Sequence, residues 1–452
     1  MEDIFKKEMI TPNPNFVKKF YFLDYFYILL KSVKMHSDEN EILEEFKILK
    51  KKYLLGESKY KRLTADDEKL TKKQLAKFAY TFQQVISESI DYNLITRKNA
   101  NSKIIDSEKK SIFLTPSGES ALQEYEKGKL SFNLFMLKKM EEKHFSFYQL
   151  LKLCYEDNTL KNGLLIFPIY SGLKLDFDKS TFTTNQHVFD YSKALMKRLE
   201  EDIRKYTKKQ IVSLQEEEGK LISKLKFDKL IGENPCESFN TEKYNSVLSH
   251  FRKYWLNYFL KNIYNYNYSF DVFNIWVERA KQAGVLYSTE FFPDFSGRIV
   301  YPTSIITKNV KNGDFMKVFE YSDSESLYVH KPLWDDNNQT EFVKTLLDEY
   351  YILQKTRKTH FINLLDLKER VCFKLRIPSF VFDDSLEHTY LLNLQGKLKI
   401  QISLEADRLP YETNAMYLKR EPVLINGKLK NIIALSTFIF LLAFSAKVSF
   451  AL

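Results

Sequence analysis

The stretch from Leu364 to Leu435 changes its hydrophobic period part-way along, and this limits what the chain can fold into. Apolar residues first recur at helical spacing until Arg376-Ile-Pro378 interrupts them as a turn. A second helical pattern follows, and we expect Ser379 to cap it. Apolar residues then alternate as in a half-buried strand, and Asn426-Gly427 predicts a two-residue hairpin. The core-facing residues expected on the second helix are Phe380, Phe382, Leu386, Tyr390 and Leu391.

A similar order of patterns occurs earlier, between residues 60 and 127. Thr71 and Gln74 have the spacing of a capping box at the start of a helix. Two strand patterns then flank a long polar stretch, and Thr115-Pro-Ser-Gly118 opens another helix. There Thr115 is the expected cap, Pro occupies the favoured first position, and Gly118 permits close packing. The residues expected on the buried side of the first helix are Leu75, Phe78, Phe82, Val85, Ile86 and Ile90.

A third, less specific example of this order of helix and strand patterns lies between residues 231 and 310. An aromatic helical stretch is followed by a helix that starts at Ser269 and stops at Gly284. Val285-Leu-Tyr287 and Arg298-Ile-Val-Tyr301 then predict a hairpin. The aromatic stripe has helical spacing and is predicted to be core, with stacking on nucleic-acid bases as the alternative.

These patterns predict a mostly α protein with small β-hairpins (α+β), built as an array of two or three modules joined by helical linkers. A charged segment over residues 188–227 is interpreted as a long surface or inter-domain helix, with a coiled coil for self-association or partner binding as the alternative. The four predicted ranges are residues 1–127, 128–230, 231–310 and 311–452, the second being the helical linker region.

Composition narrows the class of protein. With 12 Gly and 11 Pro in 452 residues, doubly wound α/β enzymes and Gly-rich phosphate loops are disfavoured. The three cysteines lie far apart and fit neither a disulfide framework nor a zinc site, so a reducing cytoplasm is predicted. The net charge of +10 suits a polyanionic partner, although it also fits an ordinary solvated surface.

The apolar tail is the feature that composition does not explain. Residues Ile432–Ala446 form an uninterrupted apolar run, shorter than the ~20 residues that a membrane-spanning helix needs. We expect a buried terminal strand or helix. A membrane anchor, or an altered reading frame or truncation, is the alternative that the sequence leaves open.

The stretch between residues 60 and 127 carries a family resemblance. Asn93-Leu-Ile95, a long polar stretch and Ile112-Phe-Leu-Thr-Pro-Ser-Gly-Glu-Ser-Ala-Leu122 resemble the wing and following helix of MarR-like winged-helix domains. The resemblance covers about 60 residues and implies binding to double-stranded DNA, with a recognition helix in the major groove and the wing on the backbone or minor groove. The alternative is a winged helix that contacts protein.

Carried over by position, the resemblance predicts the DNA-binding residues. Lys72, Lys73 and Lys77 correspond to the exposed start of the recognition helix, and Arg298 to the wing of the less specific module. In the C-terminal version, acidic residues on the second helix (Asp383, Asp384 and Glu387) would repel phosphates, so that module is predicted to pack on a protein partner or on another part of the chain. Its basic residues leave room for contact with the DNA backbone, and they are Lys397, Lys399, Lys419, Arg420 and Lys428. The residues predicted on the first wing are Arg97, Lys98, Lys103, Lys109 and Lys110.

No motif for catalysis emerges. The sequence has no phosphate loop, no nucleophile elbow and no metal-ligand spacing, and no acidic pair has the lysine that a nuclease set requires. We therefore predict no catalytic residue, metal or cofactor. The predicted function is a non-enzymatic, cytoplasmic DNA-binding subunit of a bacterial assembly for antiviral defence, restriction, replication or chromosome maintenance. A protein partner is expected and a small-molecule ligand is disfavoured; the alternatives are a restriction-type endonuclease or its specificity subunit, and a protein–protein adaptor.

Overall fold

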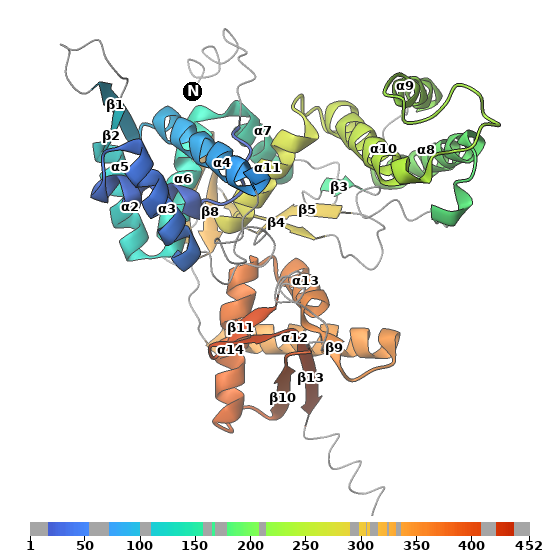
Figure 1. Ribbon diagram of the computed structural model, residues 1–452. Helices are drawn as coiled ribbons and strands as arrows, with labels where there is room; N and C mark the ends of the chain where they lie inside the picture. The colour runs from blue at the N-terminus through green and yellow to red at the C-terminus, as the bar shows by residue number, and fades with distance from the viewer. Residues whose placement is uncertain are drawn as a thin grey trace, which may run out of the picture. The chain divides into compact units, whose positions relative to one another are not determined.

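The computed structural model is mostly helical with short antiparallel strands, which confirms the predicted α+β class (Figure 1). Its contacts divide the chain into two compact units. The first contains residues 1–144, 278–287 and 303–452, and the second contains residues 145–277 and 288–302. The predicted range 231–310 is thus shared between the units. The structure describes residues 17–53, 72–99, 110–156, 165–167, 179–207, 214–289, 298–303, 305–307, 315–322, 325–330, 336–407 and 422–437.

The first unit begins with a module that we define as residues 17–127 together with the helix that follows. Its helices are α2 (Asp24–Met35), α3 (Glu39–Tyr53), α4 (Lys72–Asp91), α5 (Pro116–Lys127) and α6 (Lys129–Lys143), and its strands are β1 (Ile95–Asn99) and β2 (Lys110–Leu114). The two strands that the sequence predicts form an antiparallel pair, and the structure places Ile95 opposite Leu114. The Ile112 N–H donates to the Ser37 carbonyl at 2.9 Å. The connection between α2 and α3 therefore lies along the other edge of β2.

Helix α4 packs one face into the module and exposes the opposite face. The prediction for Ile90 is wrong, because its side chain is 36% exposed. The buried stripe continues through Glu88 instead, which places Ile90 at its margin. Thr71 lies outside the described residues, as do the side chains of Gln74 and Leu75. The residues buried as predicted are Phe78, Phe82, Val85 and Ile86.

The start of α5 has the geometry that the sequence predicts. The Gly118 N–H donates to the Thr115 hydroxyl at 3.1 Å, and Pro116 occupies the first helical position. A Cβ atom added at Gly118 would lie 2.1 Å from the Leu94 carbonyl oxygen. Glycine is therefore required where α5 crosses the chain that enters β1.

Replacing Gly118 with alanine is expected to lower the free energy of unfolding by about 1–3 kcal/mol, because backbone must move to admit the methyl group. The matched control is Gly219→Ala in α9 (Leu214–Phe227), where an added Cβ meets nothing within 4 Å. That change is expected to stabilise by about 0.5–1 kcal/mol. Chemical denaturation of both variants checks the pair, and similar effects of the same sign would contradict this packing.

The second unit is built from helices around aromatic side chains. The predicted charged segment is divided between α8 (Asn185–Thr207) and α9. Leu199 and Leu221 on these helices are fully buried, so the apolar face of the segment belongs to the core of this unit. Trp255 and Trp276 are also fully buried, which confirms that the aromatic stripe is core. The elements of this unit are α7 (Phe145–Glu156), β3 (Leu165–Phe167), α8 (Asn185–Thr207), α9, α10 (Tyr244–Tyr258), a π-helix (Phe259–Ile263) and the start of α11 (Phe270–Gln282), which passes into the first unit at Glu278.

Two small sheets follow along the chain. Strands β4 (Leu286–Thr289) and β5 (Arg298–Pro302) are neighbours, as the predicted hairpin requires, and β3 pairs with the other edge of β5. The next sheet has the order β6-β8-β7, all antiparallel. Its strands are β6 (Ile305–Thr307), β7 (Phe315–Ser322) and β8 (Glu325–His330).

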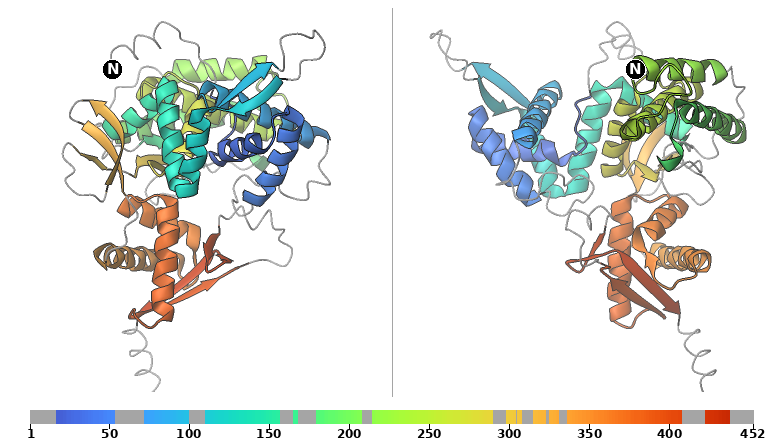
Figure 2. Two further views of the ribbon diagram at one scale, coloured as in Figure 1. Left: turned by 90° about the vertical axis from the view of Figure 1, so that its left-hand side faces the viewer. Right: turned by 45° about the vertical axis from the view of Figure 1, so that its right-hand side comes forward.

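The C-terminal module, residues 336–437, has the predicted order of helix, turn, helix, strand and hairpin (Figure 2). Its central strand β13 pairs with β10 on one side and β9 on the other, both antiparallel. Asn426 and Gly427 have φ values of 48° and 71°, as a two-residue hairpin turn needs. The elements are α12 (Asp336–Arg357), β9 (Ile362–Asn363), α13 (Leu364–Leu375), α14 (Ser379–Leu394), β10 (Ile400–Glu405), β11 (Val423–Ile425), β12 (Lys428–Lys430) and β13 (Ile432–Thr437).

Two predictions for α14 are wrong in detail. Ser379 is the first helical residue and not the cap, because the extended backbone of Pro378 occupies the cap position. Leu391, predicted to face the core, is 39% exposed. The buried face of α14 instead includes the small polar residues Ser385 and Thr389. Phe380 and Tyr390 are only half-buried. The buried residues of the helix are Val381, Phe382, Ser385, Leu386 and Thr389.

The apolar tail begins as a strand. Residues Ile432–Thr437 form β13 at the centre of its sheet, which confirms the expected terminal strand for this part of the tail. Residues 438–452 lie outside the described structure. Within the part of the chain that is described, no helix combines the length and the apolar character needed to cross a bilayer.

Candidate nucleic-acid interface

The structure brings most of the predicted DNA-binding residues of the first module onto adjacent elements. A left-handed residue, Asn93 with φ 55°, ends α4 and leads directly into β1, which pairs with β2. The start of α4 and the hairpin therefore belong to one continuous helix–strand unit. The lysines whose backbone is described are Lys72, Lys73 and Lys77, in the first six residues of α4, and Lys98 and Lys110, on β1 and β2.

Four other residues are predicted to bind DNA, and they are Arg97, Lys103, Lys109 and Arg298. Arg97 on β1 is the one whose side chain is described. Lys103 and Lys109 lie outside the described residues. Arg298 opens β5, the second strand of the hairpin predicted for the less specific module, and belongs to the second unit.

The outward face of α4 is uncharged along its described middle. Ala76, Ala79, Tyr80 and Gln83 are all exposed, and the Tyr80 side chain is 55% exposed. They recur at intervals of three and four residues, so they share one face. The face combines two methyl groups and an aromatic ring with a single amide that can donate and accept hydrogen bonds.

Glu39, which sequence reasoning missed, joins this face to the hairpin. The Gln83 amide nitrogen donates to one Glu39 carboxylate oxygen at 2.5 Å, and the Arg97 guanidinium donates to the other at 3.1 Å. Glu39 lies in the first turn of α3, where a negative charge is favourable. One carboxylate therefore holds the second half of α4 and the middle of β1 to the same helix end.

The contact between Arg97 and Glu39 makes a testable prediction about DNA affinity. Both side chains are about one-third exposed, so the ion pair contributes at most about 1 kcal/mol and can exchange for a phosphate. Arg97→Gln is expected to weaken duplex binding and to reduce the salt slope by about 1. Glu39→Gln keeps an acceptor for Gln83 but releases the arginine, and it is expected to strengthen duplex binding several-fold. Fluorescence anisotropy across a salt series measures both; equal weakening by the two variants would rule out this role for Glu39.

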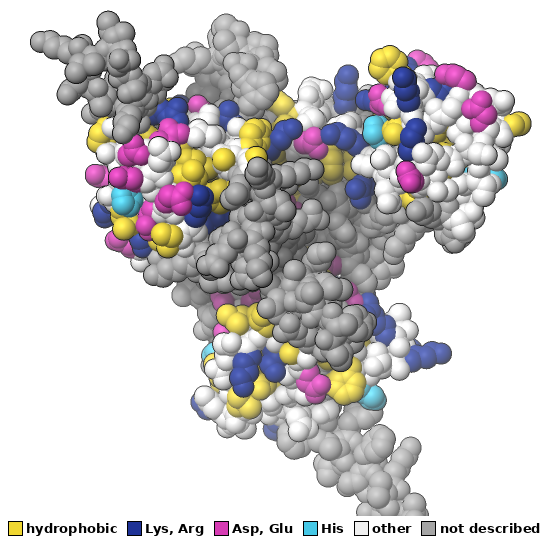
Figure 3. All heavy atoms as spheres, viewed as in Figure 1, with side chains coloured by type: hydrophobic (Ala, Val, Ile, Leu, Met, Phe, Trp, Pro, Cys, Tyr) yellow, Lys and Arg dark blue, Asp and Glu magenta, His cyan; other side chains and the backbone are white. Residues whose placement is uncertain are grey.

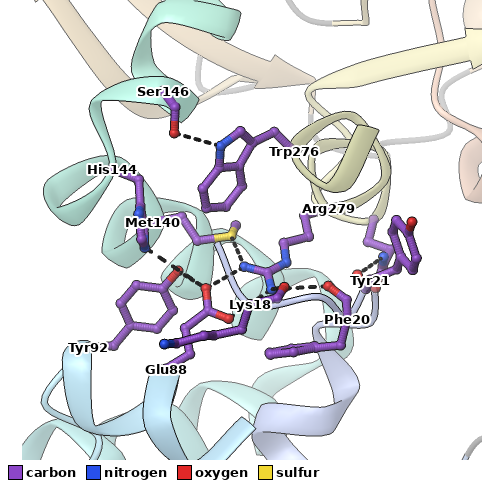
Figure 4. A network of polar contacts seen from close by, with 11 residues as sticks. Lys18, Phe20, Tyr21, Glu88, Tyr92, Met140, His144, Ser146, Trp276 and Arg279 are labelled. Carbon is purple, nitrogen blue, oxygen red and sulfur yellow. Dashed lines mark hydrogen bonds and ion pairs between the residues drawn. The ribbon is translucent and has the colours of Figure 1, made fainter. Parts of the chain in front are cut away.

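A buried ion pair lies beneath the opposite face of α4 (Figure 4). Glu88 of α4 and Arg279 of α11 are both fully buried and make two hydrogen bonds, at 2.7 and 2.9 Å. The Arg279 guanidinium also donates to the Phe20 carbonyl at 3.1 Å and stacks on the Phe20 ring, 4.5 Å from its centre. These contacts pair both charges within the protein. They fix the rotation of α4 about its axis, and with it the direction of the exposed face.

Two further groups complete this network. The Tyr92 hydroxyl donates to Glu88 at 2.6 Å, and burial raises the pKa of Tyr92 well above its usual value. His144 lies 3.9 Å from the same Glu88 oxygen, and burial lowers the pKa of His144 to about 4. The imidazole is therefore neutral at neutral pH. The indole N–H of Trp276, also drawn in Figure 4, belongs to the second unit, where it donates to Ser146 at 2.8 Å.

The corresponding helix of the C-terminal module, α14, has a different surface. Asp383 forms an ion pair with Lys368 at 2.7 Å, and Glu387 accepts the Asn426 N–H of the hairpin at 2.7 Å. Asp384 is exposed, yet partial desolvation, followed by the charges of the neighbouring acids, raises the pKa of its carboxyl group. This helix therefore presents acidic groups where α4 presents uncharged ones.

Charge alone does not mark the interface. On the face shown in Figure 3, basic and acidic side chains are interspersed over the described part of the first module. Within the described ranges, no group of three His, Cys, Asp or Glu side chains is arranged to hold a metal ion. Comparison with protein-family models, curated proteins and solved structures found no match. The function is therefore inferred from the arrangement of α4, the hairpin and Glu39.

Proposed function

We propose that this chain is a non-enzymatic protein that binds double-stranded DNA, with the first module acting as a winged helix. Helix α4 would enter the major groove and the β1–β2 hairpin would lie along the phosphate backbone. The observation that carries the proposal is the uncharged face of α4, which lies between a Lys-rich helix start and a Lys-containing hairpin. That distribution suits phosphate contacts at the ends and base contacts in the middle.

The pairing of strands supports a winged-helix arrangement in all three modules. In the sheets β10-β13-β9 and β3-β5-β4, the central strand is the last of the three in sequence. Each central strand therefore pairs on both edges with strands that come earlier in the chain. In the first module, Ser37 makes the equivalent contact with β2. In each module a helix is followed by an antiparallel strand pair, and the second strand of that pair also makes a contact at its other edge, which is the order expected of a winged helix.

The surface of α14 favours a second role for the C-terminal module. Its acidic side chains would repel phosphates, whereas its exposed Leu391 and Leu394 suit contact with protein. We propose that this module docks a protein partner and thereby brings the DNA-binding module into a bacterial assembly of the defence, restriction, replication or chromosome-maintenance kind.

Binding of the full-length chain to duplex DNA across a salt series tests the proposal. We expect binding at moderate salt, with an affinity that falls steeply as salt rises, by about 0.9 in the logarithmic slope for each phosphate contact. Intact DNA after incubation with Mg²⁺ or Mn²⁺ is part of the expected result. Metal-dependent cleavage would favour the endonuclease alternative, and failure to bind any duplex would favour the protein adaptor.

A further inference from the structure

We infer that the outward face of α4 reads A·T base pairs, with Gln83 as the residue that determines specificity for adenine. This inference rests on the proposed function and adds the class of DNA site that the module prefers. In it, the Gln83 amide recognises adenine, while Ala76, Ala79 and Tyr80 contact the methyl groups of thymine.

The chemistry of the face selects these bases. Glutamine is a hydrogen-bonding partner of adenine in the major groove, and small or aromatic apolar side chains contact the thymine methyl group. Guanine is read by arginine or lysine, and neither occurs in the sequence from Phe78 to Asp91 of α4. The lysines of this helix are confined to its first six residues, where phosphates are the nearest partners in the proposed docking.

Glu39 sets which end of the Gln83 amide faces the DNA. A carboxylate accepts hydrogen bonds but does not donate them, so the 2.5 Å contact fixes the amide with its NH₂ group toward Glu39. The Gln83 carbonyl oxygen is then presented to the groove as an acceptor. An acceptor fits the N6 amine of adenine or the N4 amine of cytosine, and it does not fit N7 of a purine, which is itself an acceptor.

The apolar part of the face decides between adenine and cytosine. An A·T pair carries a thymine methyl group on the same major-groove edge as the adenine amine, with the thymine O4 between them, whereas a C·G pair has no methyl group there. Tyr80 and Gln83 are three residues apart on one face, which corresponds to a rise of about 4.5 Å along the helix axis. Bases in one strand are about 3.4 Å apart, so ring and amide lie opposite the same or neighbouring base pairs. The combination therefore favours A·T pairs.

The test uses the full-length chain and a duplex selected by it from a random pool. We expect the selected site to be rich in A·T pairs. At one adenine, N6-methyladenine replaces the amine hydrogen that faces the major groove, and it should lower the affinity of the unchanged protein about three- to tenfold. At the same adenine, 7-deazaadenine, which lacks only N7, should change the affinity less than about twofold. Uracil in place of a contacted thymine should lower the affinity about threefold.

Two variants identify the residue responsible. Gln83→Ala should lower the affinity for the unmodified site and should no longer respond to N6-methyladenine at that adenine. The response to the modified base is the decisive readout, because loss of Gln83 also changes the surroundings of Arg97 and thereby its phosphate contact. Gln395→Ala, at the exposed end of α14, is the matched control and should behave as the unchanged protein does.

The outcomes separate this inference from the proposed function. Salt-dependent duplex binding that shows no preference for A·T pairs, or that is insensitive to N6-methyladenine at every position, would overturn the inference and leave the proposed function standing. The same holds if Gln83→Ala and the unchanged protein respond equally to the modified base. Failure to bind any duplex would overturn both.

Discussion

Reversing the charge of Lys72, Lys73, Lys77, Lys109 and Lys110 together is expected to reduce duplex DNA affinity at moderate salt by at least about a hundredfold. Each lost phosphate contact removes about 0.9 from the slope of log affinity against log salt, so loss of all five should flatten the slope by about 4–5. Lysine side chains are almost never fully buried, so the variant is expected to fold, which circular dichroism checks.

The matched control for this prediction is charge reversal of the same number of lysines outside the first module. These lysines are all exposed, and their reversal changes the net charge by the same amount. We expect a much smaller loss of affinity from this variant. Unchanged affinity after reversal of the first-module lysines, or equal losses in the two variants, would contradict the proposed interface. The control lysines, all in the C-terminal module, are Lys355, Lys358, Lys397, Lys399 and Lys428.

Removing Arg279 is expected to have the largest effect on stability. In Arg279→Met the carboxylate of Glu88 would remain fully buried without its partner, and breaking a buried pair in this way lowers the free energy of unfolding by about 3–5 kcal/mol. The double variant Glu88→Met with Arg279→Met removes both charges and should regain most of the loss, although Tyr92 loses its acceptor.

Chemical denaturation measures these variants against an exposed pair. Lys253 and Asp271 are 2.8 Å apart but about half exposed, so Lys253→Ala should change the free energy of unfolding by less than about 1 kcal/mol. An effect of Arg279→Met as small as that of Lys253→Ala would show that the buried network does not hold α4. A double variant as unstable as Arg279→Met would show that altered packing, and not the unpaired charge of Glu88, causes the loss of stability.

Local features of the fold were predictable because their signals lie within a few residues. The Thr115 cap, the close approach at Gly118 and the Asn426-Gly427 turn each depend on backbone geometry that a short motif requires. The sequence predicts the cap of α14 one position late, at Ser379, because a proline with extended backbone can also precede a helix and Pro378 occupies the cap here. The α+β class followed from the change between helical and alternating periods.

The candidate interface was only partly predictable, because its decisive contacts join distant parts of the chain. Glu39 meets Gln83 across 44 residues, and Arg279 meets Glu88 across 191. A charged residue within an apolar helix face signals a buried partner, as Arg279 does, but the sequence does not say which residue that partner is. Nothing in the sequence around Gln83 indicates its role. That role depends on the contact with Glu39 and on the face of α4 that the Glu88–Arg279 pair leaves exposed.

Site-specific photocrosslinking tests the central claim, contact between α4 and DNA, most directly. A photoreactive benzoylphenylalanine replaces Tyr80 on the outward face of α4, where the native side chain is 55% exposed. The control carries it at Phe227, the 86% exposed end of α9. We predict that irradiation with duplex DNA crosslinks the Tyr80 variant, and that excess unlabelled duplex suppresses the crosslink. Crosslinking at Phe227 without crosslinking at Tyr80 would contradict the claim.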